Sequence, residues 1–347
     1  MSNLKRSIAL CSVLVTLTLS SCWHQSSPNV KVYFVDQSTG WIVGPRLLFT
    51  SDQGKNWTVL RTNGAGTSIV ESLRDGLQSI QFLSASVAVQ LRGDKFLEST
   101  DGGRSWQEVG PLPRHRPNGT FPQSVFFLSE SEGWLFGEDI YHTTNRGRSW
   151  LRISSSPTGD PAKLQQMHVP SFYADTMPMV WFRDKSHGVM ARMDGDVYLT
   201  RDAGVSWTLV ARFSESVQGI FFFDNAVGWL VGRNGLVART QTGGESWEAS
   251  NVGQQVNLMS VVFTSVNTGC VAGDTILCTR DAGKTWMKSV VKGVQPQPPV
   301  TSLAFTTELN GWAVGGFIDP FYPSMYAPSS AILHTEDGGA SWNTITP

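Results

Sequence analysis

Acidic side chains recur along this chain inside an octet that ends in Gly-x-(Ser/Thr/Asn)-Trp. A carboxylate can act as a general acid, a base or a metal ligand, so the third octet position is a first candidate for chemistry. The seven octets carry at this position Asp52, Asp101, Asn145, Asp202, Thr242, Asp281 and Asp337, and they end in Trp57, Trp106, Trp150, Trp207, Trp247, Trp286 and Trp342. Because every repeat has the motif and two copies lack the acid, it predicts a structural turn.

The remaining acidic and His residues form no recognisable reaction centre. Asp194 and Asp196 fall in one hairpin turn, and Asp36 and Asp224 occupy equivalent repeat positions, so neither pair resembles the facing carboxylates of a glycosidase. The six His lack zinc-site spacing, and nucleophile-elbow and phosphate-loop motifs are absent. We therefore expect no enzyme activity, no metal and no cofactor. A glycan-active site assembled from distant repeats stays open as an alternative, because it would leave no local motif.

Two cysteines face each other in a predicted hairpin. If residues 273–275 form its turn, Cys270 and Cys278 lie directly opposite, with the same separation as Trp41 and Phe49 in the first repeat. In an oxidising compartment, two facing cysteines can form a disulfide, which would hold one hairpin locally. Two buried free thiols are the alternative, because not every cross-strand position has disulfide geometry.

Each octet belongs to a repeat of four short predicted strands. An apolar run such as 32–36 precedes a Gly-Trp run such as 40–44, a third strand leads into the octet, and a fourth leaves it through the Trp. Repeats of about 40–50 residues are typical of propellers and solenoids. The pattern predicts an all-β, seven-bladed β-propeller of four-stranded antiparallel blades over residues 31–347. Each blade is complete in sequence, so blades 1 and 7 should meet by side-chain packing alone, unless residues 23–30 add an edge strand.

The octet closely resembles the Asp-box of the sialidase-type (BNR) repeat families. Together with the preceding Phe-x-(Asp/Ser)-x-x-x-Gly-Trp-x-x-Gly run, it resembles the photosystem II stability/assembly factor propellers over nearly all of residues 31–347. Known members of that family are non-catalytic assembly chaperones that bind membrane-protein intermediates. The resemblance therefore implies a protein-binding scaffold, either a photosynthetic assembly factor or a distant bacterial relative of one. The alternative is a glycan-binding or glycan-cleaving surface lipoprotein, although the Phe/Tyr-Arg-Ile-Pro motif of sialidases is absent.

The first residues have the pattern of an export signal. The basic pair Lys5-Arg6 precedes an apolar core, Ile8–Leu19, that is too short to span a bilayer. The core ends in Leu-Ser-Ser-Cys22, which resembles the bacterial lipobox and implies that Cys22 carries the lipid. We thus expect a signal peptide at 1–21 and a tether at 22–30, with the propeller held at a bacterial envelope membrane on its periplasmic, lumenal or outer-surface side. An ordinary signal peptide with an incidental Cys is the alternative.

Octet spacing predicts where a binding site lies. The shortest repeats need only 39–40 residues, and the surplus elsewhere falls at 62–76, 110–122, 153–178 and 316–330. In a four-stranded blade, crossovers between blades and turns between the second and third strands emerge on one face, opposite the octets. The four insertions should therefore crowd one face over adjoining blades, and such loops usually carry function.

Two insertions contain candidate protein contacts. The basic tip Arg114-His115-Arg116 can meet a carboxylate-bearing partner, with a solvated loop as the alternative. The other contains aromatic residues, which suit a protein interface, although a lid over the central channel is equally compatible. These aromatic residues are Phe317, Phe321, Tyr322 and Tyr326. The net charge of −1 lacks the basic excess of nucleic-acid-binding proteins. We expect a monomer whose partner is a membrane-protein intermediate or an envelope protein.

Overall fold

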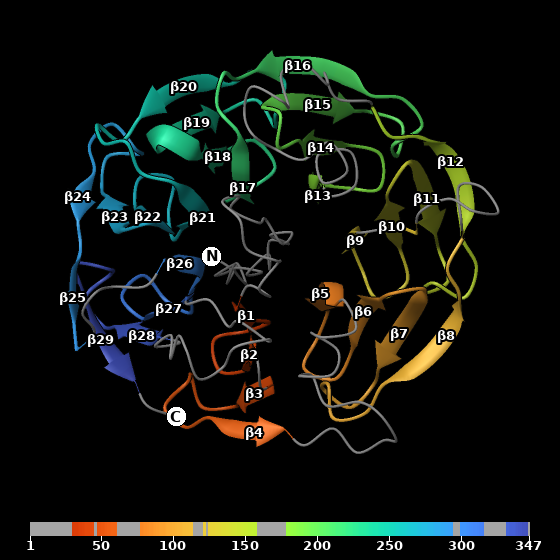
Figure 1. The fold of residues 1–347 in the computed structure, drawn as a ribbon, viewed down its shortest axis with the longest axis horizontal. Coiled ribbons are helices and arrows are strands. Elements are labelled where there is room, and N and C mark those ends of the chain that lie inside the picture. Colours follow the sequence, from red (N-terminus) through yellow and green to blue (C-terminus); the bar gives the residue numbers. More distant parts are fainter. Residues whose placement is uncertain are drawn as a thin grey trace, which may run out of the picture.

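The seven repeats form seven sheets arranged as blades around a common axis (Figure 1). The predicted seven-bladed β-propeller is confirmed: each blade contains four antiparallel strands in sequence order, with the first strand nearest the axis. Within the described residues, the one helical element is the 3-10 turn η1 (Arg233–Gly235). The computed structural model describes residues 30–44, 47–60, 77–113, 121–122, 124–157, 178–293, 299–315 and 331–345.

The strands of blades 1 to 4 follow one another without exchange. Blade 1 contains β1 (Lys31–Phe34), β2 (Gly40–Val43), β3 (Leu47–Thr50) and β4 (Thr58–Leu60). Blade 2 contains β5 (Leu77–Phe82), β6 (Ala88–Arg92), β7 (Lys95–Ser99) and β8 (Gln107–Pro111). Blade 3 contains β9 (Ser124–Phe127), β10 (Gly133–Phe136), β11 (Asp139–Thr143) and β12 (Leu151–Ser155). Blade 4 contains β13 (Met179–Phe182), β14 (Gly188–Ala191), β15 (Asp196–Thr200) and β16 (Thr208–Arg212).

Blades 5 to 7 continue the series, with one extra strand between the last two. Blade 5 contains β17 (Val217–Phe222), β18 (Gly228–Gly232), β19 (Leu236–Thr240) and β20 (Glu248–Asn251). Blade 6 contains β21 (Leu258–Phe263), β22 (Gly269–Gly273), β23 (Ile276–Thr279) and β24 (Met287–Lys288). After β25 (Val290–Lys292), blade 7 contains β26 (Val300–Phe305), β27 (Gly311–Gly315), β28 (Ala331–Thr335) and β29 (Ser341–Ile345).

Burial differs between inner and outer strands, and this explains the sequence pattern. The second strands are packed on both sides by neighbouring blades, so every residue of β10 is buried and the run is apolar throughout. The outermost strands face solvent, and every residue of β20 is exposed. The sequence of a blade therefore contains continuous apolar runs followed by a polar strand. A sheet with one face in solvent would instead show alternating apolar and polar residues.

Aromatic rings fill the seams between blades. The octet Trp of each blade packs against the preceding blade: Trp150 meets the edge of Phe96 with 5.4 Å between ring centroids, and Trp57 meets Trp312 across the seam of blades 1 and 7 at 5.4 Å. The Gly-Trp run supplies a second ring in the opposite direction, and Trp41 stacks on Phe82 of blade 2 at 4.1 Å. These rings bury large apolar areas between blades and so help to hold the ring together.

Hydrogen bonds also join blades 7 and 1, so the expectation of side-chain packing alone is wrong. The Thr301 hydroxyl donates to the Val30 carbonyl at 2.6 Å, and the Val32 amide donates to the Ser302 hydroxyl at 3.3 Å. The innermost strand of blade 7 has a register shift just before Ser302, which presents these hydroxyls to the next blade. Blades 6 and 7 use the same arrangement through Ser260. In the described part of the chain, no strand passes between blades 7 and 1.

The chain leaving blade 6 adds a fifth strand to blade 7. Strand β25 pairs in parallel with β29, and the Val290 amide donates to the Ala340 carbonyl at 3.0 Å. Beside this crossing, Cys270 on β22 lies opposite Cys278 on β23, and their sulfurs are joined in a disulfide. The seam between blades 6 and 7 thus combines strand pairing with a covalent link inside the adjacent blade.

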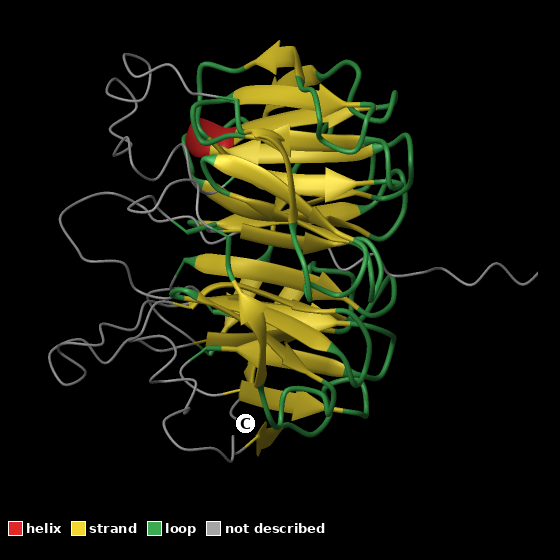
Figure 2. Cartoon of the chain, turned by 90° about the vertical axis from the view of Figure 1, so that its right-hand side faces the viewer, coloured by secondary structure: helices red, strands yellow, loops and turns green. Residues whose placement is uncertain are grey.

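Two faces of the disc differ in their connections (Figure 2). We call the face made by the octets and by the turns between first and second strands the Asp-box face. The crossover face consists of the turns between second and third strands, η1 among them, and the segments that lead to the next blade. In Figure 2 the crossover face lies on the side of η1, drawn in red. The antiparallel order of each blade fixes this division.

Candidate functional site

The octets form the same hydrogen-bonded turn in all seven blades. The hydroxyl of the first octet residue accepts a hydrogen bond from the octet glycine amide at 2.8–3.0 Å. The side chain at the third position accepts one from the amide of the seventh residue, also at 2.8–3.0 Å. Asn145 and Thr242 keep this second bond, each at 3.0 Å. The turn therefore needs an acceptor oxygen at this position and not a charge.

The octets are also bonded to the neighbouring turn of the same blade. In every blade the amide of the fourth octet residue donates to a carbonyl of the turn between the first and second strands, at 2.8–3.0 Å. Asp36 caps that turn in blade 1 by accepting from the Ser38 and Thr39 amides, both at 2.7 Å, and Asp224 does the same in blade 5. Burial acts to raise the pKa of Asp36, but these hydrogen bonds outweigh it and the pKa is lowered. Both carboxylates thus stabilise the turns that contain them.

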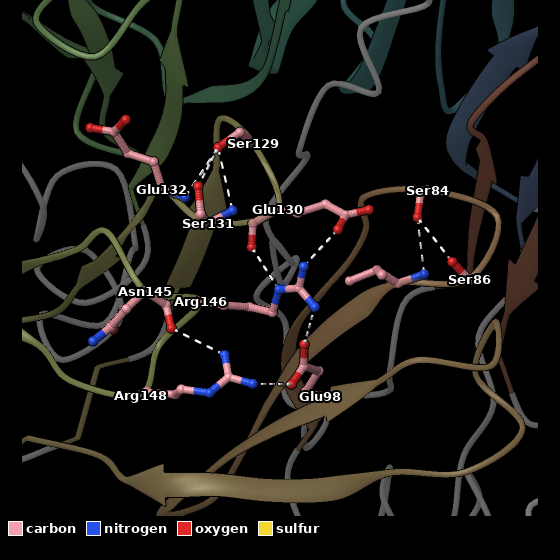
Figure 3. Close-up of polar contacts among 11 residues, drawn as sticks. Ser84, Ser86, Glu98, Ser129, Glu130, Ser131, Glu132, Asn145, Arg146 and Arg148 are labelled. Atoms are coloured by element: carbon pink, nitrogen blue, oxygen red, sulfur yellow. Dashed lines mark hydrogen bonds and ion pairs between the residues drawn. The ribbon is translucent and has the colours of Figure 1, made fainter.

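An ion cluster on the Asp-box face connects blades 2 and 3 (Figure 3). Arg146, at the fourth octet position, places Nη1 3.1 Å from Oε1 of Glu98 in blade 2 and Nη2 2.7 Å from Oε2 of Glu130 in its own blade. Arg148 pairs with the other oxygen of the same carboxylate, with its Nη2 3.9 Å from Oε2 of Glu98. Because arginine pairs with each carboxylate, the cluster links two blades rather than presenting an acid or a base to a ligand.

On the crossover face, charge is arranged differently. In blade 3 Arg152 Nη2 lies 2.7 Å from Asp139 Oδ1, and in blade 4 Arg212 Nε lies 3.5 Å from Asp196 Oδ1. The two carboxylates are almost fully buried, with side-chain exposures of 1% and 6%, whereas the arginines are 52% and 68% exposed. Each arginine is therefore held by a buried carboxylate while more than half of its side chain remains exposed to solvent.

Neighbouring hydroxyl groups complete these two anchors. The Tyr141 hydroxyl lies 3.5 Å from Asp139 Oδ2, and the Tyr198 hydroxyl lies 3.4 Å from Asp196 Oδ2. Burial, together with the adjacent carboxylate charge, raises the pKa of both tyrosines, so each hydroxyl keeps its proton and can donate it. In blade 3 Ser155 donates a further hydrogen bond to Asp139 at 2.9 Å. These contacts hold the buried carboxylates in place beside their arginines.

Blade 2 carries a charge pair at the corresponding place with the signs reversed. Lys95 Nζ lies 3.3 Å from Glu108 Oε2, and both side chains are about half exposed. Lys95 begins the third strand as Asp139 does in blade 3, and Glu108 lies on the fourth strand. We call these three pairs on neighbouring blades, Lys95–Glu108, Arg152–Asp139 and Arg212–Asp196, the charged rim.

A buried ion pair anchors the chain where it leaves blade 3. Arg192 and Asp194 are both fully buried, with 3.3 Å between Nε and Oδ2, and Arg192 Nη1 donates to the Pro157 carbonyl at 2.6 Å. Asp194 Oδ1 also accepts from the Asp196 amide at 3.1 Å. Asp194 and Asp196 therefore have separate structural partners and do not face each other across a space for substrate, as paired glycosidase carboxylates do.

Several predicted site residues fall outside the described residues. The described strands nevertheless show where their segments attach. Gly315 pairs with Ala331 across β27 and β28, so segment 316–330 leaves and returns at one turn of the crossover face. The segment that contains the basic tip follows β8 of blade 2 in the sequence. The residues concerned are Cys22, Arg114, His115, Arg116, Phe317, Phe321, Tyr322 and Tyr326.

No sequence motif predicted the charged rim. The one available signal is an Asp-x-Tyr triplet that begins the third strand in two successive blades, at 139–141 and 196–198. No metal-binding group of three or more His, Cys, Asp or Glu side chains is present in the part of the chain that the structure describes. Within that same part, none of the helical structure is long and apolar enough to cross a bilayer.

Comparisons with known proteins agree with this architecture. The family described as photosynthesis system II assembly factor YCF48 matches residues 80–220 and 208–313, which together cover more than half of the chain. The photosystem II assembly lipoprotein Ycf48 of Picosynechococcus sp. is 24% identical over 203 residues, covering 57% of this chain and 53% of the relative. The chloroplastic photosystem II stability/assembly factor HCF136 of Arabidopsis thaliana is 24% identical over 275 residues, covering 71% and 61%. The matches span about half and three fifths of these two relatives.

Solved structures show the same fold. A structure described as YCF48 bound to D1 peptide has a TM-score of 0.61 at 18% identity, covering 83% of this chain and 90% of that one. YCF48 from Cyanidioschyzon merolae has a TM-score of 0.60 at 18% identity, covering 94% and 99%. With the family match over both stretches, the chain belongs to the photosynthesis system II assembly factor YCF48 family.

Proposed function

We propose that this protein is a non-enzymatic, membrane-tethered propeller that binds a protein subunit of photosystem II during assembly, through its crossover face. Family membership and the names of the relatives supply the class of partner. One observation carries the choice of face: the octet carboxylates bond to their own turns, whereas the buried Asp139 and Asp196 of the charged rim hold arginines that are more than half exposed.

The chemistry of the rim suits a partner that carries carboxylates. A guanidinium has five N–H donors, and the anchoring aspartate uses only part of them. Because Asp139 and Asp196 already hold Arg152 and Arg212 in place, less side-chain freedom is lost when a second carboxylate binds the open edge. Charge-assisted hydrogen bonds to such a carboxylate are stronger than bonds between neutral groups.

The insertions extend this surface. In the proposal, the basic tip at Arg114-His115-Arg116 adds positive charge beside the rim, and the aromatic residues Phe317, Phe321, Tyr322 and Tyr326 supply apolar contacts from blade 7. Lipidated Cys22 holds the monomeric propeller at the membrane that contains the partner. The protein then acts by holding an assembly intermediate, and no bond is made or broken on it.

The test is recovery of partner protein from detergent-solubilised native membranes. The double variant Arg152→Lys/Arg212→Lys keeps both ion pairs but removes the planar fork, so we expect recovery to fall at least about tenfold, the effect of losing roughly 1.4 kcal/mol. The matched control is Arg201→Lys on the Asp-box face, where Arg201 pairs with Glu245 at 2.9 Å and is similarly exposed. It should bind like the wild type.

Two outcomes would contradict the proposal. Equal loss in the double variant and in the Arg201→Lys control would mean that the crossover face is not the binding face. Failure of the wild type to recover any photosystem II subunit, combined with a rise in melting temperature on adding oligosaccharides, would favour the glycan-binding alternative. Tethering is tested separately, because Cys22→Ala should move the protein from the membrane fraction to the soluble fraction without changing its affinity for the partner.

A further inference from the structure

The disulfide of blade 6 lies under the octet of blade 7. Gly339, the octet glycine, approaches the bond so closely that a Cβ on it would lie 2.6 Å from each of the Cys270 and Cys278 sulfurs. Its carbonyl oxygen is 3.4 Å from the Cys278 sulfur. In other blades the octet glycine rests on hydrocarbon, such as Leu47 for blade 2 and Val189 for blade 5. The octet of blade 7 thus packs on a disulfide, which can be reduced to two thiols.

Hydrogen bonds from the end of blade 6 also bind this octet and β29, the strand that follows it. The Ser289 hydroxyl donates to the Gly339 carbonyl at 2.5 Å and lies 3.5 Å from the Cys278 sulfur. Directly after Ser289, β25 pairs with β29, and the Thr344 hydroxyl donates to the Lys292 carbonyl at 2.9 Å. The disulfide, Ser289 and the β25–β29 pairing therefore form one continuous contact, which we call the blade 7 latch.

We propose that the blade 7 latch is redox-sensitive, because its Cys270–Cys278 disulfide fixes the octet and terminal strand of blade 7 against blade 6. Non-bonded heavy atoms rest about 3.5–4.0 Å apart, so two thiols need more room than two bonded sulfurs. The added volume has to displace Gly339, because the disulfide, its octet and Ser289 are already packed together. Reduction thus weakens the bonds of the latch without removing any apolar side chain.

The chemical step is thiol–disulfide exchange with a dithiol reductant. A thiolate of the reductant attacks one sulfur, the Cys270–Cys278 bond breaks, and a mixed disulfide forms. The second thiol of the reductant then displaces the protein sulfur. Two electrons and two protons pass to the protein, which gains two thiols, and the reductant leaves as a disulfide. Oxidation by a disulfide oxidant reverses each step.

Segment 316–330 joins β27 to β28 of blade 7, so under the proposed function the latch also affects binding. This consequence, that the oxidised protein binds its partner more tightly, depends on the proposed function. The latch itself does not, because it concerns only the seam between blades 6 and 7. Exchange of backbone amides can therefore test the latch without any partner present.

The experiment compares hydrogen–deuterium exchange of the full chain before and after treatment with dithiothreitol, with alkylation and mass measurement to record reduction. We expect exchange in peptides covering 335–345 and 289–293 to become at least about tenfold faster on reduction, because their hydrogen bonds form the latch. Exchange at the blade 5 octet and β20, residues 240–251, should not change. In the control Cys270→Ala/Cys278→Ala, exchange at 335–345 should not respond to dithiothreitol.

Three results would overturn the proposal. A disulfide that resists millimolar dithiothreitol in the folded protein is a permanent link rather than a latch. Faster exchange restricted to 269–279 would mean that the bond supports only its own hairpin. Equally faster exchange in every blade would mean that reduction unfolds the ring as a whole.

Discussion

The octet carboxylates of the Asp-box face and the buried carboxylates of the charged rim are used in opposite ways. On the Asp-box face, Asp202 accepts hydrogen bonds from the amide and hydroxyl of Ser206 within its own turn. On the crossover face, Asp196 is buried and holds Arg212, which remains largely exposed. A carboxylate that accepts hydrogen bonds within its own turn stabilises the fold. A carboxylate that holds an exposed arginine in place leaves that arginine able to bind another molecule. Under the proposed function, substitutions of the octet carboxylates should therefore affect stability and spare binding, whereas substitutions of the rim arginines should affect binding and spare stability.

The largest loss of stability should follow removal of an octet Trp. Trp342 is completely buried in the seam of blades 6 and 7, so Trp342→Ala should reduce the free energy of unfolding by about 3–5 kcal/mol. Trp286→Ala should cost less, because Trp286 is only partly buried. Urea denaturation followed by tryptophan fluorescence measures both. Equal losses at the two positions would mean that seam burial does not set the contribution of the octet Trp.

An octet glycine should be nearly as sensitive. Gly147 has φ +74° and its Cα faces the Phe96 ring of blade 2, so a methyl group there would overlap the ring. Gly147→Ala should cost about 2–4 kcal/mol through backbone strain and overpacking together. Gly253 has φ +80° with open space around it, so Gly253→Ala should show only the strain, about 1–2 kcal/mol. A smaller loss for Gly147→Ala than for Gly253→Ala would contradict the packing argument.

Loss of the octet carboxylate should matter less. Asp202→Ala removes the acceptors of three hydrogen bonds, from Thr200 and from the amide and hydroxyl of Ser206, and should cost about 1–2 kcal/mol. Thr242→Ala removes a single hydroxyl and should cost about 1 kcal/mol or less. Thermal denaturation compares the two. Binding of the partner should be unaffected in both, and a loss of binding would break the separation between the faces.

The smallest effect should be a shift in acid stability. Hydrogen bonds from Thr285 and Thr279 lower the pKa of Asp281 to about 2, against about 3.9 in an unfolded chain. Because the folded-state pKa is depressed, the stability from this group is present above about pH 4 and is lost as the pH falls through 2. Asp281→Asn should therefore lose less stability than the wild type between pH 4 and pH 2. Urea midpoints across this range are the measurement, and parallel curves would contradict the prediction.

The sequence alone predicts much of the fold because its repeats are short and local. An octet such as 200–207 contains its own turn hydrogen bonds, and the hairpin around 273–275 places its two cysteines opposite each other without reference to the rest of the chain. Burial on both sides explains why the inner strands are recognisable as apolar runs. What could be predicted therefore depends on residues that lie close together in sequence.

The charged rim could not be predicted in the same way. Arg152 lies two residues after Trp150, whereas Arg212 lies five residues after Trp207, so alignment of the repeats does not match them. A register shift in each outer hairpin changes which residues face the buried carboxylate, and register shifts leave no clear mark in the sequence. The hydroxyl contacts between blades 7 and 1 were missed for the same reason, since they follow the irregular pairing before Ser302.

The continuity of the blades has a consequence for how the ring forms. Every antiparallel pairing joins strands that follow each other in the chain, so each blade can fold soon after its residues leave the ribosome or the export channel. The bond from Thr301 to Val30 instead spans 271 positions. Long-range contacts carry the largest loop-closure entropy, so this seam should be the last and slowest to form. A circular permutant opened at the crossover between blades 4 and 5 would preserve every strand pairing and move the late step to a different seam.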